Sequence, residues 1–414
     1  MSLPTFLARW AATVSIFTQF LKLGLTSFGG PAAHIGFFHQ AFVVRQRWFD
    51  DGTFARWIAL CHLLPGPSSS QLGFLIGYQR GGWPGAVAAF VGFTLPSAMM
   101  MLGLAYGWFW LDDTWQPVWH ALVLVAAAIV IQVTWQMSRQ FCQAWPLRLL
   151  ALLTALGLML WPSVWAPVVL LLGLGIIGTL FKHRFGFLAA VATSHHSVDS
   201  GERTPAFEAR SPSIKTGWSL IVLAIGLLGI LPLLAWTDER VWSIGDGFYR
   251  AGALVFGGGH VVLPMLELEW VQTGRVTESQ FLAGYSLAQA LPGPLFTFAT
   301  YLGGVMAGWL GAVVATLAIF LPGLLLIIGI LPFYQAFTSS ERVQAGLVAV
   351  QAGVVGFLLF ALIVPILPHA LVDWASGVLV ALNLVLLFKW QWPAVWLMLL
   401  NIALYWSWVA FVSG

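Results

Sequence analysis

The chain has few charged residues. Asp, Glu, Lys and Arg together make up only 8% of its 414 residues, against roughly 25% in an ordinary soluble domain, and this shortage excludes a soluble globular protein. Hydrophobic residues make up 59%. Apolar stretches recur over residues 11–181 and again from 218 to the C-terminus, and a transmembrane helix needs about 20 such residues. We therefore predict an all-α polytopic membrane protein.

Cysteine is almost absent, and several motifs of enzyme chemistry are missing. Cys61 and Cys142 lie far apart without a CxxC partner, which disfavours both a disulfide framework and a zinc site. The chain contains neither a GxxxxGK[ST] motif for nucleotide phosphates nor an HExxH metal motif. Most cations behind the formal net charge of +3 lie at candidate membrane boundaries. We expect no metal, no cofactor, no catalytic residue and no nucleic-acid partner.

Only one long segment, residues 183–216, is polar and rich in turn-forming residues. This segment divides the chain into two membrane-embedded halves. We predict an N-terminal repeat at 1–181, a cytoplasmic linker at 182–217, an extra connecting transmembrane helix at 218–240 and a C-terminal repeat at 241–414.

Glycine and proline break the apolar stretches in two matched pairs. Phe28-Gly29-Gly30-Pro31 and Pro65-Gly66-Pro67 return as Phe256-Gly257-Gly258-Gly259 and Pro292-Gly293-Pro294, at offsets of 228 and 227, and the match continues beyond them at 226. In hydrocarbon an unpaired backbone N–H or C=O costs several kcal/mol, so such breaks are tolerated only where the freed groups face protein, water or a ligand. Helical pieces of about 10 to 14 residues beside each break would reach the bilayer midplane without crossing it.

Two topologies fit each break: a broken helix that crosses the membrane, or a re-entrant hairpin that dips in and returns. Cytoplasmic loops are enriched in Lys and Arg. The loop after the first break carries Arg45 and Arg47, whereas the equivalent loop of the second half is acidic on balance, with Glu267, Glu269 and Glu278. This charge pattern favours re-entrant hairpins in two inverted repeats, whose four breaks converge near the midplane, an arrangement that recurs in secondary transporters.

A helix that resumes after a break can bind an anion. Its first N–H groups lack intrahelical partners, and its dipole is positive at that end. Pro31 and Pro67 fit the first helical position, where a missing N–H does no harm. Hydroxyl and amide side chains add further donors near the breaks, although the alternative is that they only repair the broken backbone. These side chains are Thr26, Ser27, Ser68, Ser69, Ser70, Gln71, Gln289, Thr297 and Thr300.

Charged and titratable side chains lie in the same stretches. Lys22 and Arg250 occupy equivalent repeat positions, six residues before a Phe-Gly-Gly break. A cation near the bilayer centre costs at least ~2.5 kcal/mol, which favours a role in holding an anion; the alternative is that both snorkel to an interface. His34, His62 and His260 lie near breaks and can titrate near neutral pH, either to couple protons or as structural hydrogen-bonding groups.

These observations define one predicted substrate site for a negatively charged guest. It comprises Lys22, Thr26, Ser27, Gly29, Gly30, His34, Pro65, Gly66, Pro67, Ser68, Ser69, Gln71, Arg250, Gly257, Gly258, Gly259, His260, Gln289, Pro292, Gly293, Pro294 and Thr297.

The combined motifs resemble those of the chromate transporter family. Phe28-Gly29-Gly30-Pro31 with His34, and Pro65-Gly66-Pro67-Ser68 with Gln71, carry the resemblance in the first half. In the second half it rests on Phe256-Gly257-Gly258-Gly259-His260 and on Leu291-Pro292-Gly293-Pro294, so that both halves are covered, as in the long-chain, two-domain members.

The resemblance implies a secondary transporter that exports chromate across the bacterial inner membrane, driven by the proton motive force, and so confers chromate resistance. Chromate, protons and the lipid bilayer are then the partners, with sulfate as a competitor. The residues themselves specify only an oxyanion. A sulfate or other oxyanion transporter, a passive anion channel and, less favoured, a membrane-embedded lipid-phosphate enzyme stay open, as does the oligomeric state, with a homodimer as one alternative.

Overall fold

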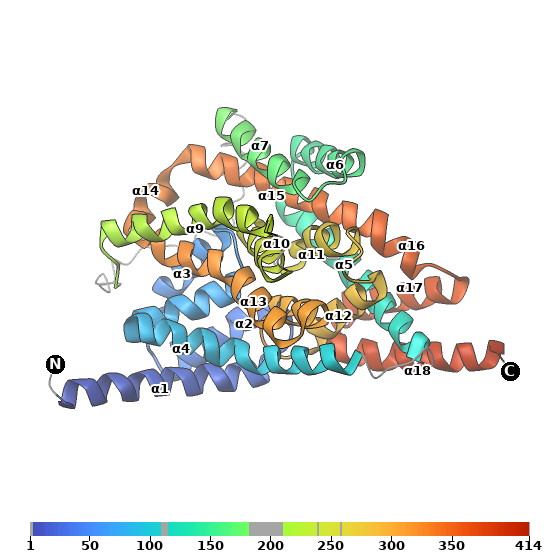
Figure 1. Ribbon diagram of the computed structural model, residues 1–414, viewed down its shortest axis with the longest axis horizontal. Helices are drawn as coiled ribbons and strands as arrows, with labels where there is room; N and C mark the ends of the chain where they lie inside the picture. The colour runs from blue at the N-terminus through green and yellow to red at the C-terminus, as the bar shows by residue number, and fades with distance from the viewer. Residues whose placement is uncertain (1–2, 109–114, 182–209, 238–239, 257–258, 414) are drawn as a thin grey trace.

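The computed structural model describes residues 3–108, 115–181, 210–237, 240–256 and 259–413. Every regular element in this part of the chain is a helix (Figure 1). Five helical segments are long and apolar enough to cross a membrane: Ser68–Gly107, Pro117–Phe141, Ile214–Ala235, Leu295–Gly329 and Glu341–Ala370. The predicted all-α polytopic membrane class is thereby confirmed.

The first half contains seven α-helices within the described residues. They are α1 (Leu3–Thr26), α2 (Gly30–Phe38), which continues into the π-helix η1 (His39–Arg45), α3 (Asp51–Leu63), α4 (Ser68–Trp108), α5 (Gln116–Phe141), α6 (Trp145–Leu160) and α7 (Ala166–Leu180). The breaks expected from glycine and proline separate α1 from α2 and α3 from α4.

The second half follows the same order after one additional helix, α9 (Ile214–Ala235). Its elements are α10 (Arg240–Leu254), the 3-10 turn η3 (Gly259–Val261), α11 (Val262–Leu266), the π-helix η4 (Glu267–Val271), α12 (Glu278–Ala290), the 3-10 turn η5 (Leu295–Thr297), α13 (Phe298–Gly329), η6 (Leu331–Phe333), α14 (Tyr334–Ser339), α15 (Glu341–Ala361), η7 (Leu362–Ile366), α16 (Leu367–Ala370), α17 (Trp374–Lys389) and α18 (Ala394–Ser413).

Equivalent glycines have equivalent geometry in the two halves. Gly82 kinks α4 at φ 65°, ψ −153°, and Gly308 kinks α13 at φ 63°, ψ −152°, a left-handed conformation that favours glycine. A Cβ at Gly24 would lie 2.6 Å from the carbonyl oxygen of Phe93, so that α1 and α4 can approach closely only because this position is glycine. These matches fit the predicted repeat; both the repeat and the inversion of its copies across the bilayer stay predictions.

The two halves interlock. Helices α4 and α13 pack against each other, α6 and α7 of the first half pack against α15 of the second, and α17 and α18 of the second half pack against α5 of the first. Figure 1 shows α6 and α7 beside α15 at one edge, and α18 beside α5 at the other. Each half therefore buries helices that belong to the other half.

Two expected boundaries differ in the structure. Helix α1 has 24 residues, longer than the predicted pieces of 10 to 14, because no proline follows Pro4 before the Phe28 break and Gly24 is accommodated within the helix where it packs against α4. Helix α9 begins at Ile214, four residues before the expected apolar run, because the Ser213 side chain accepts a hydrogen bond from the Thr216 N–H and caps the helix.

Substitution of Gly252 by alanine tests the close packing of α10 on α13. A Cβ at this position would lie 2.1 Å from the carbonyl oxygen of Ile319, and overpacking of this kind costs about 1 to 3 kcal/mol. We expect Gly252→Ala to lower the melting temperature of the detergent-purified protein clearly. Gly103→Ala is the matched control, since nothing lies within 4 Å of a Cβ there; equal melting of the two variants would contradict the packing.

Candidate functional site

The breaks of the two halves hydrogen-bond to each other. The Gly66 N–H donates to the carbonyl oxygen of Val255 over 2.7 Å, and the Gly293 N–H donates to the carbonyl oxygen of Ser27 over 3.0 Å. Gly66 and Gly293 are equivalent in the repeat, and so are Ser27 and Val255. The Pro-Gly-Pro break of each half is therefore paired with the glycine break of the other half, and we call the region that contains these two pairs the crossing point.

Glycine is required in both pairs. Gly66 has φ +122° and Gly293 has φ +98°, in the left-handed region. A Cβ at Gly66 would lie 2.8 Å from the Cα of Gly323, and a Cβ at Gly293 would lie 2.7 Å from the Ser97 Oγ. The Pro-Gly-Pro break of the first half thus touches α13 at Gly323, and that of the second half touches α4 at Ser97. Ser97 and Gly323 are equivalent positions of the predicted repeat.

Gln71, in the first turn of α4, is held in one orientation. Its Nε2 donates to the carbonyl oxygens of Pro65, over 2.8 Å, and Gly323, over 3.1 Å. Because both partners are acceptors, the amide nitrogen must face them. The Oε1 atom is buried without a hydrogen-bond partner.

Five buried polar side-chain atoms of the first half have no hydrogen-bond partner, and we call the residues that carry them the break cluster. They are Ser27 Oγ, His34 Nε2, Ser70 Oγ, Gln71 Oε1 and Thr94 Oγ1. All five side chains are at most 3% exposed. Buried polar side-chain atoms in proteins are as a rule hydrogen-bonded, so we take the break cluster as the candidate site for a polar solute.

Short contacts link three members of the break cluster, His34, Thr94 and Ser27, through neighbouring residues. His34 Nδ1 lies 3.4 Å from Ser69 Oγ, and the His34 ring packs edge-on against Phe93, next to Thr94, with ring centres 5.2 Å apart. Ser97 Oγ donates to the Thr94 carbonyl over 3.1 Å and also touches Gly293, whose N–H binds the Ser27 carbonyl. These three members therefore lie beside the point where the Gly293 break of the second half meets the Ser27 break of the first.

The second half uses its polar groups differently. His260 Nδ1 lies 2.6 Å from the Tyr285 hydroxyl and 3.1 Å from Gln289 Nε2. Because an amide nitrogen can only donate, Nδ1 accepts, and the proton of the neutral imidazole is on Nε2. Thr297 Oγ1 donates to the Pro294 carbonyl over 2.8 Å and Thr300 shares a hydrogen bond with Thr316, so these two hydroxyls satisfy local partners.

The structure separates the two predicted cations. Lys22 and its neighbour Thr26 are exposed on α1, and the Thr26 hydroxyl donates to the Lys22 carbonyl. Arg250 is buried, and its Nη2 lies 2.7 Å from Asp246 Oδ2 and 3.1 Å from Glu269 Oε2. The guanidinium charge is therefore already compensated by two carboxylates.

The remaining predicted site residues lie at the breaks themselves. Gly29 is the N-cap of α2 in a left-handed conformation, and Pro31 is in its first turn. Pro67 immediately precedes α4 instead of occupying its first position, because the helix begins at Ser68. Other members next to the breaks are Gly30, Pro65, Ser68, Ser69, Gly259, Pro292 and Pro294. Gly257 and Gly258 lie outside the described residues.

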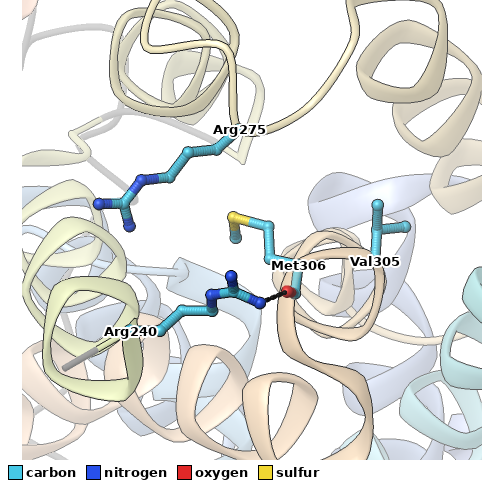
Figure 2. Close-up of a pocket in the computed structure, with 4 residues that line it drawn as sticks. All are labelled: Arg240, Arg275, Val305 and Met306. Atoms are coloured by element: carbon cyan, nitrogen blue, oxygen red, sulfur yellow. Dashed lines mark hydrogen bonds between the residues drawn. The ribbon is translucent and has the colours of Figure 1, made fainter.

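A second cationic feature was not expected from the sequence. Arg240, Arg275, Val305 and Met306 line a cavity of about 440 Å³. Figure 2 shows the two arginine side chains extending toward it from opposite walls, with the Arg240 Nη1 donating to the Met306 carbonyl over 3.4 Å. Two of the four described lining residues are therefore cationic. Its arginines come from segments that are distant in sequence and carry no shared motif.

No metal centre is apparent in the part of the chain that the structure describes, where no three His, Cys, Asp or Glu side chains are placed to hold an ion. The two cysteines are buried and free. The polar groups at the crossing point are hydroxyls, an imidazole and an amide, which suit direct hydrogen bonding to a small polar solute.

Comparison with known proteins gives a consistent result over both halves. Residues 14–179 and 242–406 match the chromate transporter family. A chromate transport protein of Pseudomonas aeruginosa is 28% identical over 344 residues, 83% of this chain and 78% of that protein. One from Cupriavidus metallidurans is 27% identical over 94% of this chain and 90% of its own length, and an uncharacterized transporter of Methanocaldococcus jannaschii is 24% identical over 91% and 90%. No solved structure matches the chain.

Serine-to-alanine substitutions distinguish a built site from a structural contact. Ser70 Oγ is buried without a partner, so we expect Ser70→Ala to leave the melting temperature unchanged or to raise it. Ser286 is equally buried, but its Oγ donates to the Leu122 carbonyl over 2.6 Å and links the halves. Loss of that bond should cost about 1 kcal/mol. A destabilised Ser70→Ala protein, measured in detergent, would show that the Ser70 hydroxyl is structural.

Proposed function

The chain belongs to the chromate transporter family, and from that premise we propose that it is a secondary transporter that exports chromate from the cytoplasm and thereby confers chromate resistance. The proton motive force drives the export. The protein is a multi-pass membrane protein; we place it in the bacterial inner membrane, with the linker at 182–217 on the cytoplasmic side.

The proposal rests mainly on one observation: the breaks of the two halves are hydrogen-bonded to each other, and the break cluster supplies buried polar atoms that have no partner. Chromate is a tetrahedral dianion and accepts hydrogen bonds on every oxygen. The hydroxyls of Ser27, Ser70 and Thr94 and the imidazole of His34 supply donors at the crossing point. The free N–H groups in the first turn of α4 add the positive end of a helix dipole, worth ~0.3 to 1 kcal/mol and up to about 2 when partly buried.

The orientation of Gln71 favours chromate over sulfate. Its Nε2 is occupied by two carbonyl oxygens, and its Oε1 is buried without a partner, so we assign Oε1 as an acceptor for the bound ion. An acceptor repels a fully deprotonated oxyanion but accepts a hydrogen bond from a protonated one. Chromate is the more basic dianion and is partly protonated near neutral pH, whereas sulfate is not. We propose that Gln71 selects the hydrogen chromate ion in this way.

Alternating access follows from the same arrangement. The crossing point is built from both halves, so a movement of one half against the other opens it to one side and then to the other, as in transporters with inverted repeats. The positive-φ kinks at Gly82 and Gly308 are equivalent positions in α4 and α13. We propose them as the hinges, and we propose the Arg240–Arg275 cavity as an anion vestibule on the outer side.

Uptake of radiolabelled chromate by inverted membrane vesicles tests the function. We expect saturable accumulation that responds to an imposed pH gradient, and weak competition by sulfate, because sulfate carries no proton for Gln71 Oε1. Absence of chromate accumulation under any gradient would exclude the proposed transport. Flux that follows the membrane potential without a response to pH would indicate a channel.

Two neighbouring hydroxyls give a matched pair of variants. The Ser27 Oγ belongs to the break cluster, whereas Thr26 is exposed and its hydroxyl bonds within α1. A hydrogen bond to a charged group is worth ~1.5 to 3 kcal/mol, so Ser27→Ala should raise the apparent KM for chromate about tenfold or more. Thr26→Ala should transport as the unsubstituted protein does. An equal KM in both variants would remove Ser27 from the site.

A further inference from the structure

The buried ion cluster of Asp246, Arg250 and Glu269 has a geometry that the anion site does not use. Arg250 Nη2 lies 2.7 Å from Asp246 Oδ2 and 3.1 Å from Glu269 Oε2. Side-chain exposure is 8% for Arg250, 11% for Asp246 and 16% for Glu269. The groups are largely removed from solvent, and Glu269 keeps a narrow contact with it.

The charges of this cluster do not balance when all three groups are ionised. Two carboxylates carry two negative charges, and one guanidinium carries one positive charge. An uncompensated charge is costly to bury, and arginine does not lose its proton in proteins. One proton bound by either carboxylate makes the cluster neutral. The arrangement therefore suits a site that takes up and releases a single proton.

Among the described residues, no other charged group contacts the two carboxylates of the cluster, although Arg275 interacts electrostatically with Glu269. On α10 itself, Arg240 donates to the Met306 carbonyl. On the packed elements, α13 carries no charged side chain, α9 carries only Lys215 in its first turn, and η3 carries His260, which is bound to Tyr285 and Gln289. Three further groups lie on η4 and beyond it. Glu267 faces Gln272, Glu278 is paired with His369, and Arg275 lies over the Trp270 ring and donates to Ser243.

The cluster exists in only one of the two halves. The repeat positions of Asp246, Arg250 and Glu269 are Thr18, Lys22 and Ala41 in the first half. Only the cation is retained there, and it is exposed on α1. Both halves have a π-helix at the equivalent place, and π-helical turns are frequent at functional sites. A site that is absent from the other copy supplies one titrating centre per chain.

Arg250 also links the cluster to the first half. Its Nη1 donates to the Val164 carbonyl over 3.2 Å, and its guanidinium carbon lies 4.6 Å from the centre of the Trp165 ring, both in the α6–α7 connection of the first half. Five residues further along the chain, about 7.5 Å of helix, Val255 accepts the hydrogen bond from Gly66. Helix α10 thus connects the charge cluster directly to the crossing of the breaks.

We propose that Asp246, Arg250 and Glu269 form the proton-binding site that couples chromate export to the proton gradient. A proton from the outer side binds to a carboxylate oxygen of Asp246 or Glu269 and weakens its hold on Arg250. The balance of Arg250 contacts then shifts toward Val164 and Trp165, which changes the position of α10 relative to the first half. Release of the proton to the cytoplasm restores the ion pairs. This inference rests on the proposed chromate export.

The test compares two transport modes in vesicles that contain the full chain. Asp246→Asn and Glu269→Gln each keep one carboxylate for Arg250 and remove the surplus charge. We expect accumulation driven by a pH gradient to fall by about tenfold or more, and chromate–chromate exchange at equal pH to change by less than about threefold and to become insensitive to pH. Glu267→Gln is the matched control, because this buried carboxylate faces Gln272.

The outcomes separate this inference from the proposed function. Absence of chromate accumulation by the unsubstituted protein overturns the function. Normal pH-driven accumulation in Asp246→Asn and Glu269→Gln overturns the inference alone. Loss of exchange together with accumulation also overturns it, because the carboxylates would then serve permeation or folding and not coupling. A coupling defect of equal size in Glu267→Gln would contradict the specific role of the cluster.

Discussion

Satisfaction of backbone hydrogen bonds inside the hydrocarbon layer is the constraint on which this structure depends. Every glycine and proline break leaves N–H and C=O groups that lipid cannot bind. The chain meets this requirement by pairing breaks across its halves, through Gly66 with Val255 and Gly293 with Ser27. The same requirement brings four helix ends together, and the donors at those ends form the polar environment of the candidate site.

Much of this fold is readable from the sequence because the effects are local. Glycine and proline close together in sequence favour the end of a helix, so the breaks at Gly29 and Pro65 could be placed from the residues alone, although single prolines such as Pro96 and Pro322 lie inside α4 and α13. The length of α1 was underestimated, since the expected piece took account of the break and not of the uninterrupted run before it. The pairing of Gly66 with Val255 joins residues far apart in the chain, and no local pattern specifies it.

The residues of the candidate site, too, could be predicted only where the signal is local in the sequence. Ser27, His34 and Gln71 were predicted from their distance to the breaks, and they are buried at the crossing point. Thr94 was missed because it lies in the middle of α4, far from any break in sequence. The symmetry of Lys22 and Arg250 predicted one shared environment, whereas only Arg250 has an acidic residue four positions before it. That spacing places Asp246 on the same helix face and was the available signal.

The reciprocal pairing of the breaks also constrains how the protein can be made. When Gly66 enters the membrane, its partner Val255 has yet to be synthesised, about 190 residues later, which at roughly 5 to 20 residues per second takes about 10 to 40 seconds. During that interval the first half holds an unpaired backbone donor and lacks α15, against which α6 and α7 pack. The newly inserted first half must therefore wait in an incompletely folded state, bound to water or to the insertion machinery, until the second half arrives to complete it.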